Sequence, residues 1–273
     1  MKQAVFAIMK KDIRQVLKNK QTAAPMIVVP LIFTVFLPLI TLMPVLMSAD
    51  AGTASEDMEY VESMLAMMGG SALNMPAEML NSAQQIAYLM LNYLMMPMFL
   101  LIPVMVASVI AANAIVGERE RKTLETLLYA PVPAKHIFLG KVLAAFVPAM
   151  TITAASIGIY AAVTNTIGQV MMGIWLFDFS NWVGFLCLLT PAFALLGIIL
   201  MVFVSTKAKT YQSAQQWTII IILPLVALMT AQTSGLLYVP QWIMLCVGAV
   251  LLAVDFILIV KGLGRFTRPK LIQ

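Results

Sequence analysis

One stretch of the sequence, IAYLMLNYLMMPMFLLIPVMVASVIAANAIV at residues 86–116, carries no charged side chain. The hydrocarbon core of a bilayer takes about 20 apolar residues of a helix, so this stretch is long enough to cross it with some tilt. The rest of the chain has the same character, because 62% of its 273 residues are hydrophobic and only 11% are charged. A soluble domain is about a quarter charged. The sequence therefore predicts an integral membrane protein.

Six apolar runs are long enough for a membrane helix. They are residues 23–47, 86–116, 139–163, 183–204, 213–231 and 242–260. The first run also contains Pro25, Pro30, Pro38 and Pro44. Proline removes a backbone hydrogen bond and crowds the preceding turn, so we expect kinks there. We predict one all-α membrane domain with six transmembrane helices that occupies residues 1–273.

The connections between these runs alternate in charge. All 17 Lys and Arg residues fall within residues 1–22, 117–141, 207–209 and 261–270. Residues 48–85 carry acids and no base. Basic connections stay on the cytoplasmic side of a membrane. The alternation therefore predicts six spans, both termini in the cytoplasm and a place in the cell membrane, and it explains the excess of base without nucleic acid.

Residues 1–22 have the pattern of an amphipathic helix. Apolar residues recur at helical spacing at Val5, Phe6, Met9, Ile13, Val16 and Leu17. The other face carries Lys10, Lys11, Arg14 and Lys18. This pattern is typical of a helix that lies in the membrane interface with its cations toward the lipid headgroups. Such a helix either anchors the first span or acts as an elbow that transmits movement to it.

Residues 48–85 form the longest connection, and we expect them to be external. One helical face would hold Met58, Val61, Leu65 and Met68, before Gly69 and Gly70 end the pattern. A short helix on the outer surface fits this spacing. Methionine thioethers suit copper(I), but methionine is also ordinary apolar filler. We predict no metal site and keep metal binding by this loop as the alternative.

No motif in the sequence predicts catalysis. The chain has no G-x-x-x-x-G-K-[ST] loop, no G-x-S-x-G elbow and no H-E-x-x-H pair, and His136 is its only histidine. Cys187 and Cys246 lie within apolar runs and are expected to be inert, buried thiols. Asp255 is the one clearly intramembrane acid, which marks either a functional polar site or a structural group near the inner interface. We therefore expect neither an enzyme nor a bound cofactor.

The cytoplasmic connection at residues 117–135 reads GERERKTLETLLYAPVPAK. Leu124, Leu127 and Leu128 recur at helical spacing, and the two prolines that follow end the pattern. Three leucines facing water are unfavourable, so the pattern predicts a short helix that docks on a partner. The alternative is a solvated loop held by weak ion pairs.

This segment resembles the ABC type-2 permease family, the membrane subunits of ATP-binding-cassette exporters. The family pattern is close to E-x-E-x-x-T-L-E-x-L-L-x-x-P, with Gly-Lys opening the third span. The matching residues are Glu118, Glu120, Thr123, Leu124, Glu125, Leu127, Leu128, Pro131, Gly140 and Lys141. Lys122 stands where the family often has glycine. The insertion after the first span is similar to that of the sodium- and drug-efflux branch, and it differs from the polysaccharide and lipid branches.

The resemblance implies that this chain forms the translocation pathway of an exporter. It implies a second copy or a related permease, and separate ATPase subunits that hold ATP and Mg. The matched residues from Glu118 to Leu128 would couple the permease to the ATPase. A stand-alone secondary transporter would more often show inverted repeats and more intramembrane charge. That class remains an alternative, together with a scaffold or sensor that transports nothing.

Overall fold

The apolar runs of the sequence form long helices. The structure is a computed structural model that describes residues 2–43, 82–121, 133–205, 207–208, 210–233 and 241–265. Six helices within these residues are long and apolar enough to cross a membrane, namely Thr22–Met43, Ala87–Glu120, Lys135–Met172, Trp182–Val204, Tyr211–Gln232 and Trp242–Lys261. The all-α membrane fold with six spans is therefore confirmed. The predicted docking helix and most of the predicted external loop lie outside the described residues.

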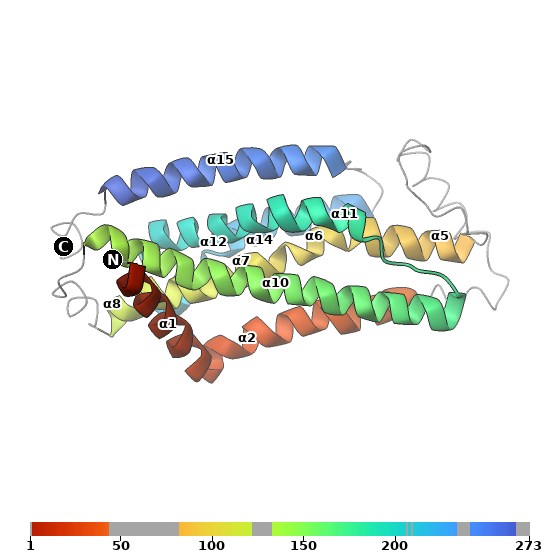
Figure 1. Cartoon of the computed structure of the whole chain (residues 1–273), viewed down its shortest axis with the longest axis horizontal. Helices are drawn as coiled ribbons and strands as arrows, with labels where there is room; N and C mark the ends of the chain where they lie inside the picture. The colour runs from red at the N-terminus through yellow and green to blue at the C-terminus, as the bar shows by residue number, and fades with distance from the viewer. Residues whose placement is uncertain are drawn as a thin grey trace.

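The long helices run side by side along the length of the molecule, and α1 crosses them at one end (Figure 1). In chain order the helical elements, with π-helical segments labelled η, are α1 (Lys2–Lys18), α2 (Lys20–Leu31), η1 (Ile32–Phe36), α5 (Ser82–Leu89), η2 (Met90–Leu94), α6 (Met96–Phe99), α7 (Leu101–Ala112), η3 (Asn113–Gly117), α8 (Glu118–Glu120), α10 (Ala134–Met172), α11 (Phe179–Gly184), η4 (Phe185–Leu189), α12 (Thr190–Val204), α13 (Tyr211–Gln216), α14 (Ile219–Thr233) and α15 (Gln241–Arg265).

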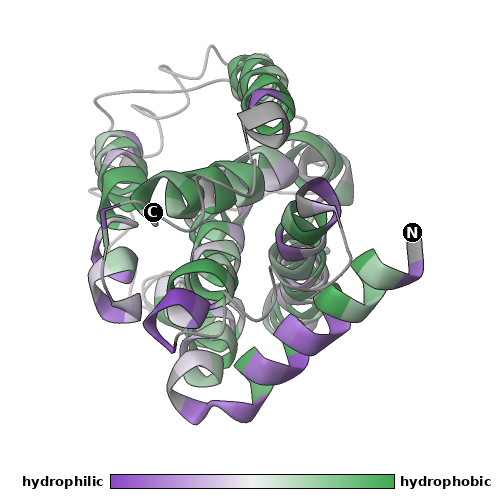
Figure 2. Ribbon diagram, turned by 90° about the vertical axis from the view of Figure 1, so that its left-hand side faces the viewer, coloured by the Kyte–Doolittle hydropathy of each residue, from purple (hydrophilic) through white to green (hydrophobic). Residues whose placement is uncertain are grey.

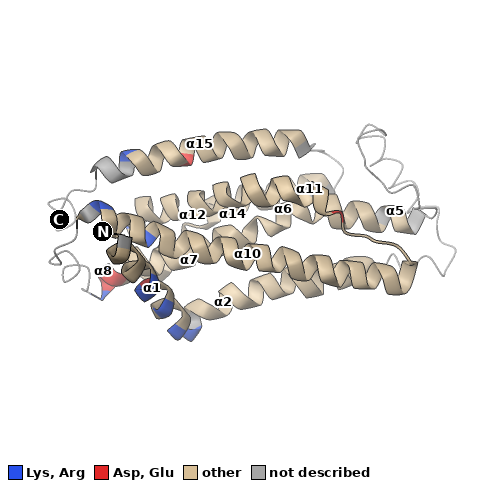
Figure 3. Ribbon diagram, in the orientation of Figure 1, with Lys and Arg blue, Asp and Glu red and all other residues tan. Residues whose placement is uncertain are grey.

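The Lys and Arg residues of the described chain, blue in Figure 3, lie toward one end of the bundle. We name it the basic end, and it contains α1, α8, the first turns of α10 and the last turns of α15 (Figure 1). The opposite end contains α5, α11 and the last turns of α10. The described chain thus begins and finishes at the same end, as an even number of crossings requires.

The bend between α1 and α2 sets the position of α1. The Thr22 hydroxyl donates to the carbonyls of Val16 at 3.0 Å and Asn19 at 2.9 Å. It therefore occupies acceptors that the last turn of α1 leaves free. On the N-terminal side of this bend, α1 packs against α10 across the basic end. Figure 2 shows hydrophilic and hydrophobic residues segregated along α1, as the amphipathic pattern predicts.

The interior of the bundle is built around α7. In the most apolar 18-residue stretch of Ala87–Glu120, 89% of the residues are buried. Within it, α7 packs on both α10 and α12. A Cβ atom added at Gly197 of α12 would come within 3.2 Å of the Val104 carbonyl oxygen. Glycine therefore lets the two backbones approach, which is a common way to pack membrane helices.

Other helices turn most of their surface outward. In the most apolar 18-residue stretch of Trp242–Lys261, which belongs to α15, only 11% of the residues are buried. Cys187 and Cys246 are exposed, so the prediction that these thiols are buried is wrong. An apolar run does not distinguish the interior of a membrane protein from its surface, because lipid tails accept apolar side chains as readily as a protein core does.

Proline explains three of the π-helical segments. η1, η2 and η4 are followed within three residues by Pro38, Pro97 and Pro191, respectively. Proline has no N–H to donate and crowds the turn before it. In a π-helical turn each N–H bonds the carbonyl five residues before it instead of four. Such π-bulges let a helix bend without ending. The kinks expected in the first span are thus accompanied by a π segment at residues 32–36.

Side-chain hydrogen bonds hold the connection between α10 and α11 at the opposite end. α10 ends where Gly173 takes a left-handed conformation, with φ of 69°. The Asn92 amide donates to the Leu176 carbonyl at 2.7 Å and accepts from the Asp178 N–H at 3.0 Å. Asn165 of α10 accepts another backbone N–H of this connection at 2.9 Å. The end of α10 is therefore tied to η2 and to α11.

Buried aromatic rings fill the space beside this connection. The ring of Phe99 lies 4.8 Å from that of Tyr160 and 5.1 Å from that of Trp182, in edge-on arrangements that aromatic pairs favour. The Tyr160 hydroxyl donates to the Leu91 carbonyl at 2.8 Å. The opposite end is consequently a well-packed junction of several helices.

Candidate functional site

Four charged side chains meet at the basic end, and we name them the ion-pair cluster: Lys11, Asp12, Glu118 and Lys141. One Glu118 oxygen lies 2.5 Å from the Lys11 ammonium and the other lies 2.5 Å from the Lys141 ammonium. Asp12 lies 3.6 Å from Lys11 and 3.8 Å from Lys141. Lys141 also donates to the carbonyl of Ala114. The cluster joins α1, α10 and the η3–α8 segment.

The cluster is largely shielded from solvent. Asp12, Glu118 and Lys141 are buried, whereas the Lys11 side chain is 48% exposed. Burial raises the pKa of the Asp12 carboxyl, although Lys141 opposes this shift. Burial works to lower the pKa of Lys11, but its bond with Glu118 and the nearby acids raise it overall. Two acids and two bases balance one another, which is how buried charges are normally tolerated.

Gly140 brings α1 close enough for these contacts. A Cβ atom there would stand 3.0 Å from Cγ2 of Ile8 and 3.3 Å from the Val5 carbonyl oxygen. The absence of a side chain thus lets α1 lie directly on α10. The next residue, Lys141, then reaches Glu118. The Gly-Lys pair at the start of the third span therefore has two linked geometric roles.

The residues after Glu118 contact two further helices. Arg119 donates to the Ser205 carbonyl at the end of α12 at 3.0 Å. Glu120 accepts the backbone N–H of Tyr211, in the first turn of α13, at 2.9 Å. An acid at a helix N-terminus satisfies a free N–H and complements the helix dipole. The chain from Glu118 to Glu120 is therefore connected to α1, α10, α12 and α13.

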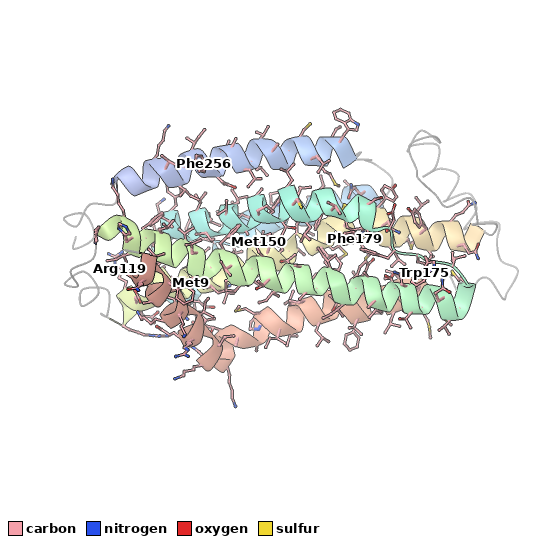
Figure 4. The ribbon with its side chains drawn as sticks, in the orientation of Figure 1. Met9, Arg119, Met150, Trp175, Phe179 and Phe256 are labelled. Atoms are coloured by element: carbon pink, nitrogen blue, oxygen red, sulfur yellow. The ribbon has the colours of Figure 1, made fainter. Side chains whose placement is uncertain are left out.

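The structure describes only part of the predicted coupling motif. Glu118 and Glu120 are placed as above, whereas Thr123, Leu124, Glu125, Leu127 and Leu128 lie outside the described residues. Of the predicted lipid-facing cations, Lys10, Arg14 and Lys18 are exposed. Lys11 instead turns partly into the cluster. Figure 4 shows Met9 of α1 and Arg119 at the basic end, with Trp175 at the opposite end.

Asp12 is the member of the cluster that the sequence reasoning missed. Its side chain lies on the buried face of α1 with Ile8 and Val16, at four-residue spacing. The predicted apolar face includes Val16 but neither Ile8 nor Asp12, so the buried face is turned partly away from the predicted one. An acid in line with buried apolar residues was the available signal.

Asp255 is fully buried on α15, and neither carboxylate oxygen has a hydrogen-bond partner among the described residues. Within the same described residues, no group of three His, Cys, Asp or Glu side chains is placed to hold a metal ion. The predicted alternative of a methionine metal site falls mostly on residues 44–81, outside the described chain.

A family model described as ABC-2 family transporter protein matches residues 6–260, which include the ion-pair cluster and all six spans apart from Lys261, the last residue of the sixth. The chain belongs to the ABC-2 family of transporter proteins. It is thus a multi-pass membrane permease of the ABC transporter type, and the resemblance read from residues 118–141 is confirmed. No curated protein matches the chain. Members of this family are membrane components of transporters. In the described chain the ion-pair cluster joins the start of the segment at residues 117–135 to α1 and α10, and Arg119 and Glu120 join it to α12 and α13.

Proposed function

We propose that this ABC-2 permease is the membrane subunit of an exporter driven by a separate ATPase. The basic end would lie in the cytoplasm, and residues 117–135 would dock on the ATPase. Two permease chains, identical or related, would enclose the pathway. The family match and the one-sided distribution of Lys and Arg support this proposal.

The ion-pair cluster is the observation that carries the proposal. A displacement of the segment after Glu118 acts on α1 through Lys11 and on α10 through Lys141, because both lysines bond the same carboxylate. Arg119 extends the connection to α12. ATP can shift the permease between two states only if contacts with the ATPase differ between them. The segment that begins in the cluster is where we expect those contacts to form.

We place the energy source on another subunit, because this sequence has no phosphate-binding loop. Co-expression with a candidate ABC ATPase tests this division of labour. We expect the ATPase to co-purify with the permease and to account for all ATP hydrolysis, while the permease alone hydrolyses none. Robust ATP turnover by a preparation free of ATPase would overturn the proposal, as would failure of every candidate ATPase to bind.

Movement of α1 provides a second measurement. Spin labels on cysteines at Gln3 and Lys135, in a chain with Cys187 and Cys246 replaced by alanine, report the separation of α1 and the start of α10. We expect that separation to change when ATP is trapped on the bound ATPase. Lys11→Met should reduce the change by removing the link to Glu118. Lys10→Met, at an exposed neighbouring position on α1, is the matched control and should not.

A further inference from the structure

A long groove with apolar walls lies between α12, α14 and α15. Its volume is about 560 Å³, and the α12 side of its lining runs from Leu189 to Phe203. These two residues are 14 positions apart, or roughly 21 Å at the rise of an α-helix. One leaflet of the hydrocarbon core of a bilayer is about 15 Å thick. The groove is therefore long enough to hold one acyl chain that runs parallel to the helices.

The groove is open on its outer side in the described chain. Leu189 and Leu225, which line its floor, are buried. Phe203, Ile220 and Val247 also line it, and each of them is about half exposed or more. The two outer walls pack on different helices, since α15 packs on α12 and η4 and α14 packs on η2, α6 and α7. Lipid tails are as apolar as these side chains, so a lipid chain can fill the opening.

At the basic end the α12 wall of the groove leads to Lys207. The Ala208 N–H donates to the Val204 carbonyl at 2.8 Å, so one more helical turn follows the end of α12. Lys207 comes four residues after Phe203 in this turn, and residues four apart are neighbours on a helix surface. Lys207 is exposed and forms no ion pair with the described residues. Its charge is therefore available at the end of the groove.

The α15 and α14 walls lead to Lys261 and Trp217 at the same end. Lys261 comes three residues after Leu258, and it is exposed without an ion pair in the described parts of the chain. Trp217 is 41% exposed, and its carbonyl accepts the N–H of Ile220 at 3.1 Å. Lysines near a membrane surface attract anionic lipids, and tryptophan favours the headgroup region. This end of the groove thus has the chemistry of a phospholipid headgroup site.

We propose that the groove binds an anionic phospholipid of the leaflet at the basic end. One acyl chain lies between α12, α14 and α15, and the phosphate pairs with Lys207 and Lys261. The bound chain supplies contacts to α15, whose surface is mostly turned outward, and so holds this helix against the bundle. Neither the ATPase nor a transported substrate takes part in this binding, which therefore goes beyond the proposed function.

Native mass spectrometry of the purified permease counts the lipids that each chain retains. We expect phosphatidylglycerol to bind saturably, with one molecule held per chain. Phosphatidylcholine with the same acyl chains has no net charge and should bind at least about tenfold more weakly. Glycerol 3-phosphate, which has the phosphate but no acyl chain, should not displace the bound lipid.

A charge-matched pair of double variants tests the two lysines. Lys207→Gln combined with Lys261→Gln should weaken phosphatidylglycerol binding at least about tenfold, because each lysine attracts the anionic headgroup. Lys10→Gln combined with Lys135→Gln removes the same charge from exposed positions on α1 and α10. Neither helix is among those that line the groove in the described chain, so this control should bind the lipid as the wild-type chain does.

Two tryptophan variants of α15 test the apolar part of the site separately. Val247→Trp fills part of the groove from a half-exposed position, where folding should tolerate it, and it should weaken lipid binding. Val260→Trp adds the same side chain at a position that is 51% exposed. Val260 comes two residues after Leu258 and therefore lies on the opposite side of α15, so this variant should leave binding unchanged.

Any of four results would overturn this assignment: no saturable phosphatidylglycerol, equal binding of the two lipids, displacement by glycerol 3-phosphate, or unchanged binding by the variant at Lys207 and Lys261. The same spectra count permease chains and so show whether a second copy covers the groove instead. In that case Val247→Trp would reduce the proportion of dimers and leave lipid binding unchanged, which also overturns it. We expect the opposite pattern, with less lipid and the same proportion of dimers.

Discussion

Glu118 occupies the centre of the ion-pair cluster, with a lysine on each carboxylate oxygen. The motif at residues 118–128 identified Glu118 but not its partners. Lys11 and Lys141 are 107 and 23 residues away in sequence, and only the packing of α1 on α10 brings them together. An amphipathic pattern assigns residues to faces of one helix. It gives no information about a charged partner on another helix, so Lys11 was expected to face lipid headgroups.

The first prediction concerns this charge pair. Glu118→Gln leaves Lys141 buried beside fewer negative charges, and we expect a loss of about 3 kcal/mol in the free energy of unfolding. Lys141→Met should be similarly harmful, whereas the double variant should be less unstable than the sum of the two by at least about 1 kcal/mol. Unfolding of the purified chain in mixed micelles measures all three. Additive losses would show that the two side chains do not interact.

Exposed Glu120 offers the matched control for this experiment. Glu120→Gln retains an oxygen that can accept the Tyr211 N–H. The charge it loses is surrounded by solvent, where an ion pair is worth about 1 kcal/mol or less. Its unfolding free energy should therefore stay within about 1 kcal/mol of the wild-type value.

At the scale of elements, the close contact between α1 and α10 depends on the glycine at position 140, which has no side chain to separate the two helices. The sequence predicted that residues 1–22 form an amphipathic helix, and α1 confirms the helix. Its direction could not be predicted, since it follows from the bend at Asn19 and from the space above Gly140. The π segments were also missed, because local wide turns leave the apolar pattern of a span unchanged.

Two glycines of α10 give a matched pair of variants. Gly140→Leu should force α1 away from α10 and cost about 1–3 kcal/mol, because the nearest atoms belong to Ile8 and to backbone. Gly158→Leu should cost nothing, since a Cβ atom there meets no atom within 4 Å. The distance between spin labels at Gln3 and Lys135, in a chain with Cys187 and Cys246 replaced by alanine, reports whether α1 stays in place. An equal distance in both variants would contradict this role for Gly140.

The docking segment supplies the next prediction. Leu127→Arg puts an unpaired charge into the contact with the ATPase, and binding should weaken by several kcal/mol if the contact is dry. Glu125→Lys should have a milder effect, of about 1 kcal/mol or less, as a rim charge does. Pull-down of the ATPase at matched membrane abundance measures both. Full retention with Leu127→Arg would show that the leucines at 124, 127 and 128 do not form the coupling surface.

At the scale of the whole molecule, the number of spans was predictable because it depends on composition. A long apolar run must either cross the bilayer or be enclosed by other helices, and six such runs became six helices. The neighbours of each helix were not predictable, because apolar residues cover most of every span and single out no buried face. Hydropathy alone therefore could not distinguish the enclosed α7 from the outward-facing α15.

The orientation of these spans leads to the last prediction. Single cysteines at Glu59 and Lys209, in a chain with Cys187 and Cys246 replaced by alanine, should react with an impermeant thiol reagent from opposite sides of the membrane. Glu59 should label in intact cells, and Lys209 only in inverted vesicles. The positive-inside rule gives this expectation. Labelling of both positions from the same side would exclude the arrangement of six spans with cytoplasmic termini.

The hydrogen bonds of Asn92 and Asn165 also have a mechanical meaning. They fix the far end of α10, whose 39 residues span roughly 58 Å at the rise of an α-helix. A rod fixed at one end moves as a lever, and its free end travels furthest. Lys141 lies 24 residues from Asn165, or roughly 36 Å along the helix, so a tilt of about 5° about that residue would shift Lys141 by roughly 3 Å. A small rotation at the aromatic junction is therefore sufficient to accompany a shift as long as an ion-pair contact at the basic end.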